Sequence, residues 1–265
     1  MKVKTNGTML NYEVEGPEDV PAIMVSHGIA TSLEIWTEAS SHLKSKYRVV
    51  RYDSRGHGGS DAWGPYSLET LAADAVGLMD ALGIKKAHYG GVSLGGMTAI
   101  GVGLLYPERV HSIIPCDARA QTNDEGNKSW QGRIEAVLKT GIEAIVEDSI
   151  SRWVAKSFYD DKAKHERLKQ IVRGTSVPGY IGSSQALQGL NYGSRLGEIR
   201  VPALYLTGEE DKGASPEVMK AMRDKTPGAQ FAEIPKAGHL SSFERPKEVA
   251  AAIEKFISSL PSKAA

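Results

Sequence analysis

The stretch Gly90-Gly91-Val92-Ser93-Leu94-Gly95-Gly96 constrains the fold more than any other part of this chain. It follows an apolar, strand-like run and opens an apolar, helix-like run. In this context Gly91-x-Ser93-x-Gly95 predicts a nucleophile elbow, a sharp strand-to-helix turn with the serine at its tip. Side chains two residues before and after Ser93 would collide in such a turn, so glycine fits both places. We therefore expect a strained backbone at Ser93.

Strand-like and helix-like segments alternate through the first part of the chain. Apolar runs at 22–25, 47–52 and 110–115 have the character of buried strands, and Asn6-Gly7 predicts a hairpin before them. The alternation resumes at 201–206 and ends with a strand at 231–234 and a helix at 246–257. This pattern predicts an α/β fold with a mostly parallel sheet and helices on both faces.

The alternation is interrupted between residues 119 and 196. This stretch contains helix-like segments at 132–139, 142–156, 162–172 and 179–190, and it contains no convincing strand. We interpret residues 119–196 as an inserted helical cap over the carboxyl ends of the strands, and residues 1–118 with 197–265 as the α/β core. Ligands bind at that edge in open parallel sheets.

Composition excludes several classes of function. Lys and Arg total 32, and so do Asp and Glu, so the chain has no electrostatic footprint for nucleic acid or an anionic membrane. The single cysteine, Cys116, cannot form an internal disulfide, and its apolar surroundings predict a small buried hydrophobic residue. No stretch has the length of a transmembrane span, and no signal peptide is recognisable, which predicts a cytoplasmic protein. Nothing in the sequence indicates the oligomeric state.

Three residues in the order nucleophile, acid and base are candidates for a catalytic triad. Ser93 stands at the elbow, Asp211 follows the strand at 201–206, and His239 follows the last strand. Loops after parallel strands gather at one edge, so the three side chains can meet. Serine is a weak nucleophile, so His239 would take its proton and Asp211 would orient and stabilise the imidazole. The backbone N–H groups of Ile29 and Leu94 are the candidate oxyanion donors.

Other residues could be assigned to the same roles. Glu209, Glu210 and Asp117 are rivals for the acid, and Asp117 is the most serious because it follows the strand next to the elbow strand. His27 could be catalytic, but a role in structuring its loop is favoured. The segment 53–60, with Asp53, Arg55 and His57, reads as a polar loop that hydrogen-bonds within itself.

These motifs together resemble the α/β-hydrolase superfamily. The resemblance rests on the elbow, His27-Gly28, Arg55-Gly56-His57-Gly58-Gly59-Ser60, Gly208-x-x-Asp211 and Gly238-His239-Leu240. Within that superfamily, Arg51–Gly58, Gly64–Ser67, Leu82-Gly83-Ile84, Ser93–Met97, Tyr106–Val110 and Arg152-Trp153 are similar to 3-oxoadipate enol-lactonases of aromatic degradation. Esterases and cofactor-free haloperoxidases share most of these motifs.

The sequence departs from the enol-lactonase pattern at two places near the expected pocket. Those enzymes tend to have Asn-Ser-Leu-Gly where this chain has His27-Gly28-Ile29-Ala30, and Cys-Asn-Thr-Ala where it has Cys116-Asp117-Ala118-Arg119. Arg119 is a fixed cation that could hold a substrate carboxylate, or it could cover the first cap helix. Trp130, Trp153 and Phe158 could line the inner face of the cap or pack in its core.

The resemblance implies a serine hydrolase for a small ester or lactone, with no metal or organic cofactor. Hydrolysis of a 3-oxoadipate enol-lactone is the best single hypothesis. General carboxylester hydrolysis, perhydrolysis and C–C bond hydrolysis remain alternatives on the same triad. A small-ligand-binding protein without turnover is the alternative of another class, although binding alone would not require an intact triad.

Overall fold

The computed structural model describes residues 1–64 and 66–261, so Pro65 of the Gly64–Ser67 motif and residues 262–265 of the predicted core lie outside it. One sheet of eight strands runs through the described residues in the order β1-β2-β4-β3-β5-β6-β7-β8. The strands are β1 (Lys2–Thr5), β2 (Thr8–Glu15), β3 (Ala22–Ser26), β4 (Arg48–Tyr52), β5 (Ala87–Val92), β6 (Val110–Cys116), β7 (Leu204–Gly208) and β8 (Gln230–Ile234).

The sheet is antiparallel at one end and parallel elsewhere. The β1–β2 hairpin turns at Asn6 and Gly7, both with positive φ, as an Asn-Gly turn requires. β2 pairs antiparallel with β4, and every later pairing is parallel. β3 and β5 are buried along their whole length, which suits strands covered by helices on both faces. The predicted mostly parallel α/β sheet is confirmed.

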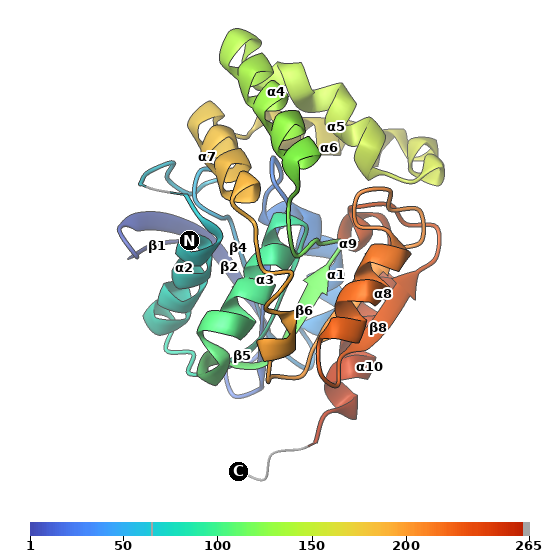
Figure 1. Ribbon diagram of the computed structural model, residues 1–265. Coiled ribbons are helices and arrows are strands. Elements are labelled where there is room, and N and C mark those ends of the chain that lie inside the picture. Colours follow the sequence, from blue (N-terminus) through green and yellow to red (C-terminus); the bar gives the residue numbers. More distant parts are fainter. Residues whose placement is uncertain (65, 262–265) are drawn as a thin grey trace.

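Helices pack on both faces of the sheet (Figure 1). α2 packs against α3, which also contacts β5 and β6, while α1 packs against α10. The α3 helix is apolar nearly all round and buried for most of its length, because it lies between α2 and the sheet. The core helices are α1 (Thr37–Leu43), α2 (Leu68–Ala81), α3 (Leu94–Leu105), α8 (Pro216–Lys225), α9 (Ser241–Glu244) and α10 (Pro246–Ser259).

Helices also fill the stretch between β6 and β7. They are α4 (Asp124–Thr140), α5 (Val146–Trp153), α6 (Lys162–Arg173) and α7 (Val177–Gln188). Figure 1 shows these helices as a layer above one end of the sheet. We call them the cap; the division of the chain at 118/119 and 196/197 stays a prediction. Within the described residues, no helix has the length and apolar character needed to cross a membrane.

Candidate active site

Ser93 occupies a strained turn between β5 and α3. Its backbone has φ 54° and ψ −111°, a region that residues other than glycine rarely adopt. A Cβ added at Gly91 would lie 2.6 Å from the carbonyl carbon of Gly95, and one at Gly95 would lie 2.6 Å from the carbonyl oxygen of Ser26. Both glycines are therefore required by close backbone packing, as the elbow motif predicts.

Two backbone N–H groups next to Ser93 are left without an internal acceptor. Leu94 is the first residue of α3, where an N–H has no partner within the helix. Ile29 lies in the loop after β3, and a Cβ added at the neighbouring Gly28 would lie 3.4 Å from Ser93 Cβ. Neither N–H hydrogen-bonds to another group in the described part of the chain. The geometry suits an oxyanion hole.

His239 is held by Asp211 across two loops. His239 Nδ1 lies 2.8 Å from Asp211 Oδ2, while Asp211 Oδ1 accepts from the N–H groups of Gly213 (2.7 Å) and Ala214 (3.0 Å). Burial alone would raise the pKa of Asp211, but His239 and these N–H groups hold it below its usual value. Burial alone would lower the pKa of His239, but the Asp211 charge raises it. Asp211 is thus an anion that orients the ring and stabilises its cation.

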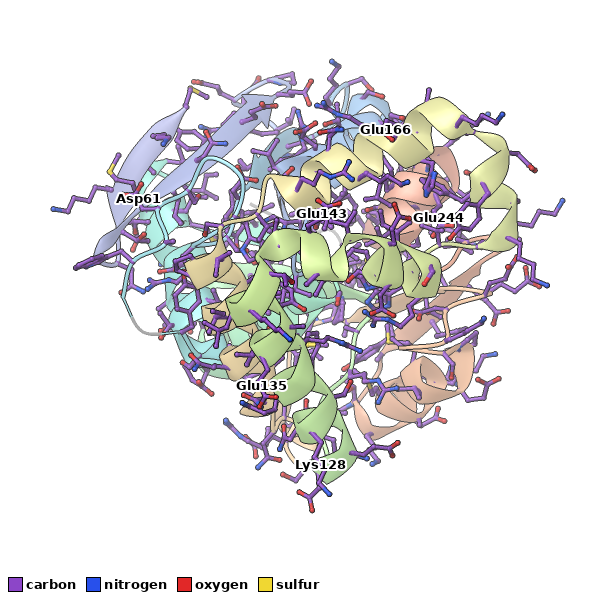
Figure 2. All side chains as sticks on the ribbon, turned by 90° about the horizontal axis from the view of Figure 1, so that it is seen from above. Asp61, Lys128, Glu135, Glu143, Glu166 and Glu244 are labelled. Atoms are coloured by element: carbon purple, nitrogen blue, oxygen red, sulfur yellow. The ribbon has the colours of Figure 1, made fainter. Side chains whose placement is uncertain are left out.

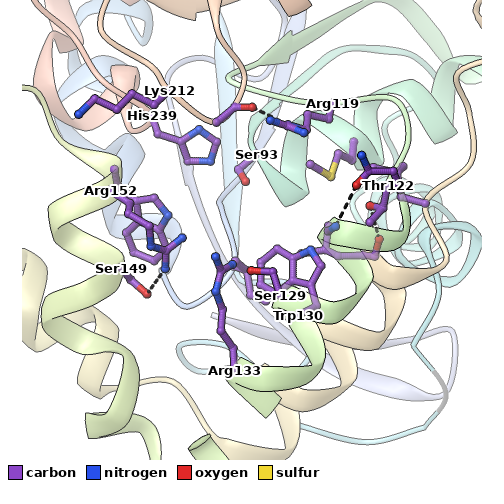
Figure 3. A pocket seen from close by; sticks show the side chains of 18 of the residues that line it. Ser93, Arg119, Thr122, Ser129, Trp130, Arg133, Ser149, Arg152, Lys212 and His239 are labelled. Atoms are coloured by element: carbon purple, nitrogen blue, oxygen red, sulfur yellow. Dashed lines mark hydrogen bonds between the residues drawn. The ribbon is translucent and has the colours of Figure 1, made fainter. Parts of the chain in front are cut away.

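Ser93 and His239 both line a cavity of about 380 Å³ beneath the cap (Figure 3). Figure 3 shows the serine side chain and the imidazole ring on the same wall. No hydrogen bond joins them among the described residues. Such contacts are often loose without substrate and tighten when it binds.

The α4 and α5 helices form the opposite wall of the cavity. Gly126, Ser129, Trp130 and Arg133 lie at helical spacing on one face of α4 and all line it. Ser149, Arg152 and Trp153 do the same from α5. No Asp or Glu belongs to the lining within the described chain, whereas Arg119, Arg133, Arg152 and Lys212 do. The cavity therefore presents positive charge to a ligand.

The family profile for the α/β hydrolase fold matches residues 21–246. The chain belongs to the α/β-hydrolase family. It is 32% identical over 261 residues to 3-oxoadipate enol-lactonase 1 of Acinetobacter baylyi, covering 98% of this chain and 97% of the relative. The match extends beyond the motifs to nearly the whole chain, and it supports an ester-cleaving hydrolase.

Two solved structures resemble this hydrolase along nearly its whole length. The enol-lactonase from Burkholderia xenovorans LB400 superposes with a TM-score of 0.93 at 28% identity, covering 97% of this chain and 100% of that one. A thermophilic esterase from Thermogutta terrifontis superposes with a TM-score of 0.92 at 29% identity, covering 97% and 98%. The motifs predict a resemblance to enol-lactonases and to esterases, and the superpositions show the same two resemblances in three dimensions.

The rival acids of this hydrolase contact other groups. Asp117, fully buried and with φ 49°, accepts from Gly208 N–H at 2.9 Å and from the Ser241 hydroxyl at 2.6 Å. It therefore joins the ends of β6 and β7 to the start of α9. Glu209 accepts from the backbone N–H of Lys236, and the exposed Glu210 lies against the N–H of Lys156. Asp211 alone among the four hydrogen-bonds to the His239 ring.

His27 and His57 support the loop that carries Ile29. His27 Nε2 accepts from Ser54 N–H at 2.9 Å, so its Nδ1 carries the proton and donates to the carbonyl of Gly28. His57 Nε2 accepts from Ala30 N–H at 3.0 Å. Burial lowers the pKa of His27 to about 4 and that of His57 to about 3, so both rings stay neutral acceptors. These contacts agree with the structural role expected for both histidines.

The arginines at the cavity differ in their partners. Arg119 Nε donates to the carbonyl of Gly213, and Arg152 is paired with Asp148 through Nε at 3.1 Å and Nη2 at 2.8 Å. Half-buried Arg133 stacks over Trp130 at 4.6 Å and makes no ion pair or hydrogen bond among the described residues. Its guanidinium points into the cavity in Figure 3. Arg133 is thus the arginine most available to an anionic ligand.

The three aromatic candidates divide into two groups. Trp130 and Trp153 line the cavity. Phe158 does not line it, so of the two roles that the sequence left open for this residue, packing is the one observed. Its ring packs 5.9 Å from Phe243 and edge-on to His165, because the turn after α5 directs it between the cap and α9.

Proposed function

We propose that this hydrolase cleaves small lactones or esters through an acyl-enzyme on Ser93. The observation that carries the proposal is the strained Ser93 facing the same cavity as an imidazole held by a buried carboxylate. Ser93 Oγ attacks the substrate carbonyl while His239 accepts its proton. The N–H groups of Ile29 and Leu94 donate to the oxyanion that forms.

The remaining steps use the same groups, with His239 first donating the proton that it accepted and later accepting another. As the tetrahedral intermediate collapses, the bond to the ring oxygen breaks and His239 returns its proton to that oxygen. An enol leaving group then tautomerises to a ketone. Water attacks the acyl-enzyme, gives its proton to His239 and releases the carboxylic acid as Ser93 recovers its proton.

We propose a lactone that carries a free carboxylate, of the 3-oxoadipate enol-lactone type, as the substrate. Its support is the positive cavity, in which Arg133 has no anionic partner among the described residues. Two of the similar proteins are named enol-lactonases, and the Thermogutta esterase was solved with malate, a dicarboxylate, bound. A buried carboxylate without a cation would be costly, so Arg133 suits this role. Arg119, predicted for it, remains the second candidate.

The test is a panel of lactones and esters with and without a carboxylate, assayed beside fluorophosphonate labelling. Labelling at Ser93 with turnover of 4-nitrophenyl acetate supports the serine hydrolase. A kcat/KM for anionic lactones well above that for neutral ones supports the substrate class. Absence of both labelling and turnover would favour the non-catalytic binding protein, and turnover without any preference would favour a general carboxylesterase.

A further inference from the structure

The loop that carries His239 is bound directly to the cap. His239 N–H donates to the carbonyl of Trp153 at 2.5 Å. A Cβ added at Gly238 would lie 2.3 Å from that carbonyl oxygen and 2.8 Å from the N of Ala155. Only glycine allows this approach, so the segment 153–155 at the end of α5 packs against the backbone of the histidine loop.

The Glu244 side chain joins the same two segments. Its Oε2 accepts from Ala155 N–H at 2.8 Å, and its Oε1 accepts from Gly238 N–H at 2.9 Å. Glu244 is only 9% exposed, so water offers these groups little alternative. Figure 2 places it where the cap meets the C-terminal part of the core, whereas Glu135 and Glu166 lie on the cap helices α4 and α6. One buried carboxylate thus bridges cap and core.

We propose that Glu244 is a positioning residue that couples the cap to His239. The proposal rests on the function proposed above. Arg152 and Trp153 line the cavity, and Trp153 begins the segment that Glu244 and His239 hold. Substrate contacts with α5 are therefore transmitted over one or two residues to the backbone of the general base. Because proton transfer depends on close alignment of His239 with Ser93, a loosened bridge slows the chemical step.

The charge of Glu244 also acts on the imidazole. Burial lowers the pKa of His239, whereas the charges of Asp211, Asp117 and, least of the three, Glu244 raise it. Burial raises the pKa of Glu244 itself to about 7, against the backbone N–H donors and the nearby Arg245, which lower it. Where Glu244 is ionised, at and above about pH 7, its charge holds the pKa of His239 up, so removal of Glu244 should move that pKa downward, which a purely structural role would not require.

Glu244→Gln tests the proposal, because the amide keeps the shape but can accept from only one of the two N–H groups. We expect kcat for 4-nitrophenyl acetate to fall about tenfold or more, with a smaller change in KM. The acidic limb of kcat/KM should move to lower pH, and the amides of Ala155 and Gly238 should exchange faster with solvent. The control is Glu209→Gln, an exposed carboxylate that also accepts a backbone N–H, at Lys236. It should stay within about twofold of wild type.

A folded Glu244→Gln protein with wild-type kcat, acidic limb and amide exchange would overturn the proposal. If that variant does not fold, Glu244→Asp keeps the charge but shortens the side chain. We then expect reduced kcat and faster amide exchange with the acidic limb unchanged, and wild-type kcat and exchange would overturn the proposal. Amide exchange needs no substrate, so it tests the coupling even if labelling of Ser93 were to fail and refute the proposed hydrolysis.

Discussion

Asp211 Oδ2 lies 2.8 Å from Nδ1 of His239, and this contact joins the loop after β7 to the loop after β8. The second oxygen of Asp211 is occupied by the N–H groups of Gly213 and Ala214. The carboxylate therefore cannot turn away without leaving these donors unpaired. Nδ1 must carry the proton in this arrangement, which leaves Nε2 free to accept one from Ser93.

Replacing the nucleophile gives the first prediction. Ser93→Ala should lower kcat by a factor on the order of 10⁶, because no other group can form the acyl-enzyme. The fold should persist, since the hydroxyl contributes no side-chain cap to α3. Steady-state hydrolysis of 4-nitrophenyl acetate and fluorophosphonate labelling measure the effect. Activity within tenfold of wild type would exclude Ser93 as the nucleophile.

Replacing the acid separates Asp211 from its rival. Asp211→Asn should lower kcat by roughly 10⁴, because the amide favours the wrong imidazole tautomer. Asp117→Asn should cost far less activity but should reduce the free energy of unfolding by about 1–3 kcal/mol, because its amide group would face backbone donors. Kinetics and thermal unfolding of both variants check this. The opposite ranking in kcat would assign the acid to Asp117.

The pH dependence follows from the His239–Asp211 pair. His239 acts as a base only when neutral, so kcat/KM should fall on acidification through one group. The Asp211 charge raises the pKa of His239, so the midpoint should lie above the ordinary histidine value of 6.5. In Asp211→Asn the histidine pKa should fall, which an NMR titration of the imidazole can measure. A midpoint that is the same in both proteins would mean that another group controls the acidic limb.

Much of the candidate site follows from chain order. The hairpin, the elbow and the loops after β7 and β8 carry local signals, and a parallel sheet brings those loops to one edge. The start of α4 is different. The sequence predicts a helix from residue 132, but α4 begins at Asp124, where the Asn123 side chain caps Gly126 N–H at 2.9 Å. These first turns consist of glycine and polar residues, so they lack the apolar periodicity from which a helix is predicted.

The cavity wall was harder to predict for a related reason. Gly126, Ser129, Trp130 and Arg133 repeat at i, i+3, i+4 and i+7, which would be a buried stripe if the residues were apolar. Their polarity makes this face resemble a solvated one, although it faces a cavity. The sequence does carry one signal for this wall, which is a stripe of small, hydroxyl-bearing, aromatic and cationic side chains at helical spacing. It would have favoured Arg133 over Arg119 as the residue that faces a ligand.

The last prediction concerns the two arginines. Truncating one partner of a buried charge pair costs roughly 2–5 kcal/mol, much of it from leaving the other charge unpaired. Arg133→Ala should therefore lower kcat/KM for carboxylate-bearing lactones at least about 30-fold, the low end of that range. Arg119→Ala is the matched variant in the same cavity, and it should cost less, because the Arg119 guanidinium already donates to Gly213. Hydrolysis of neutral 4-nitrophenyl acetate should change only a few-fold in either variant, since this ester offers no anion to pair. A larger loss in Arg119→Ala would mean that Arg119, as predicted from the sequence, binds the substrate carboxylate. Equal losses on anionic and neutral substrates would make Arg133 a structural residue that holds Trp130 in place.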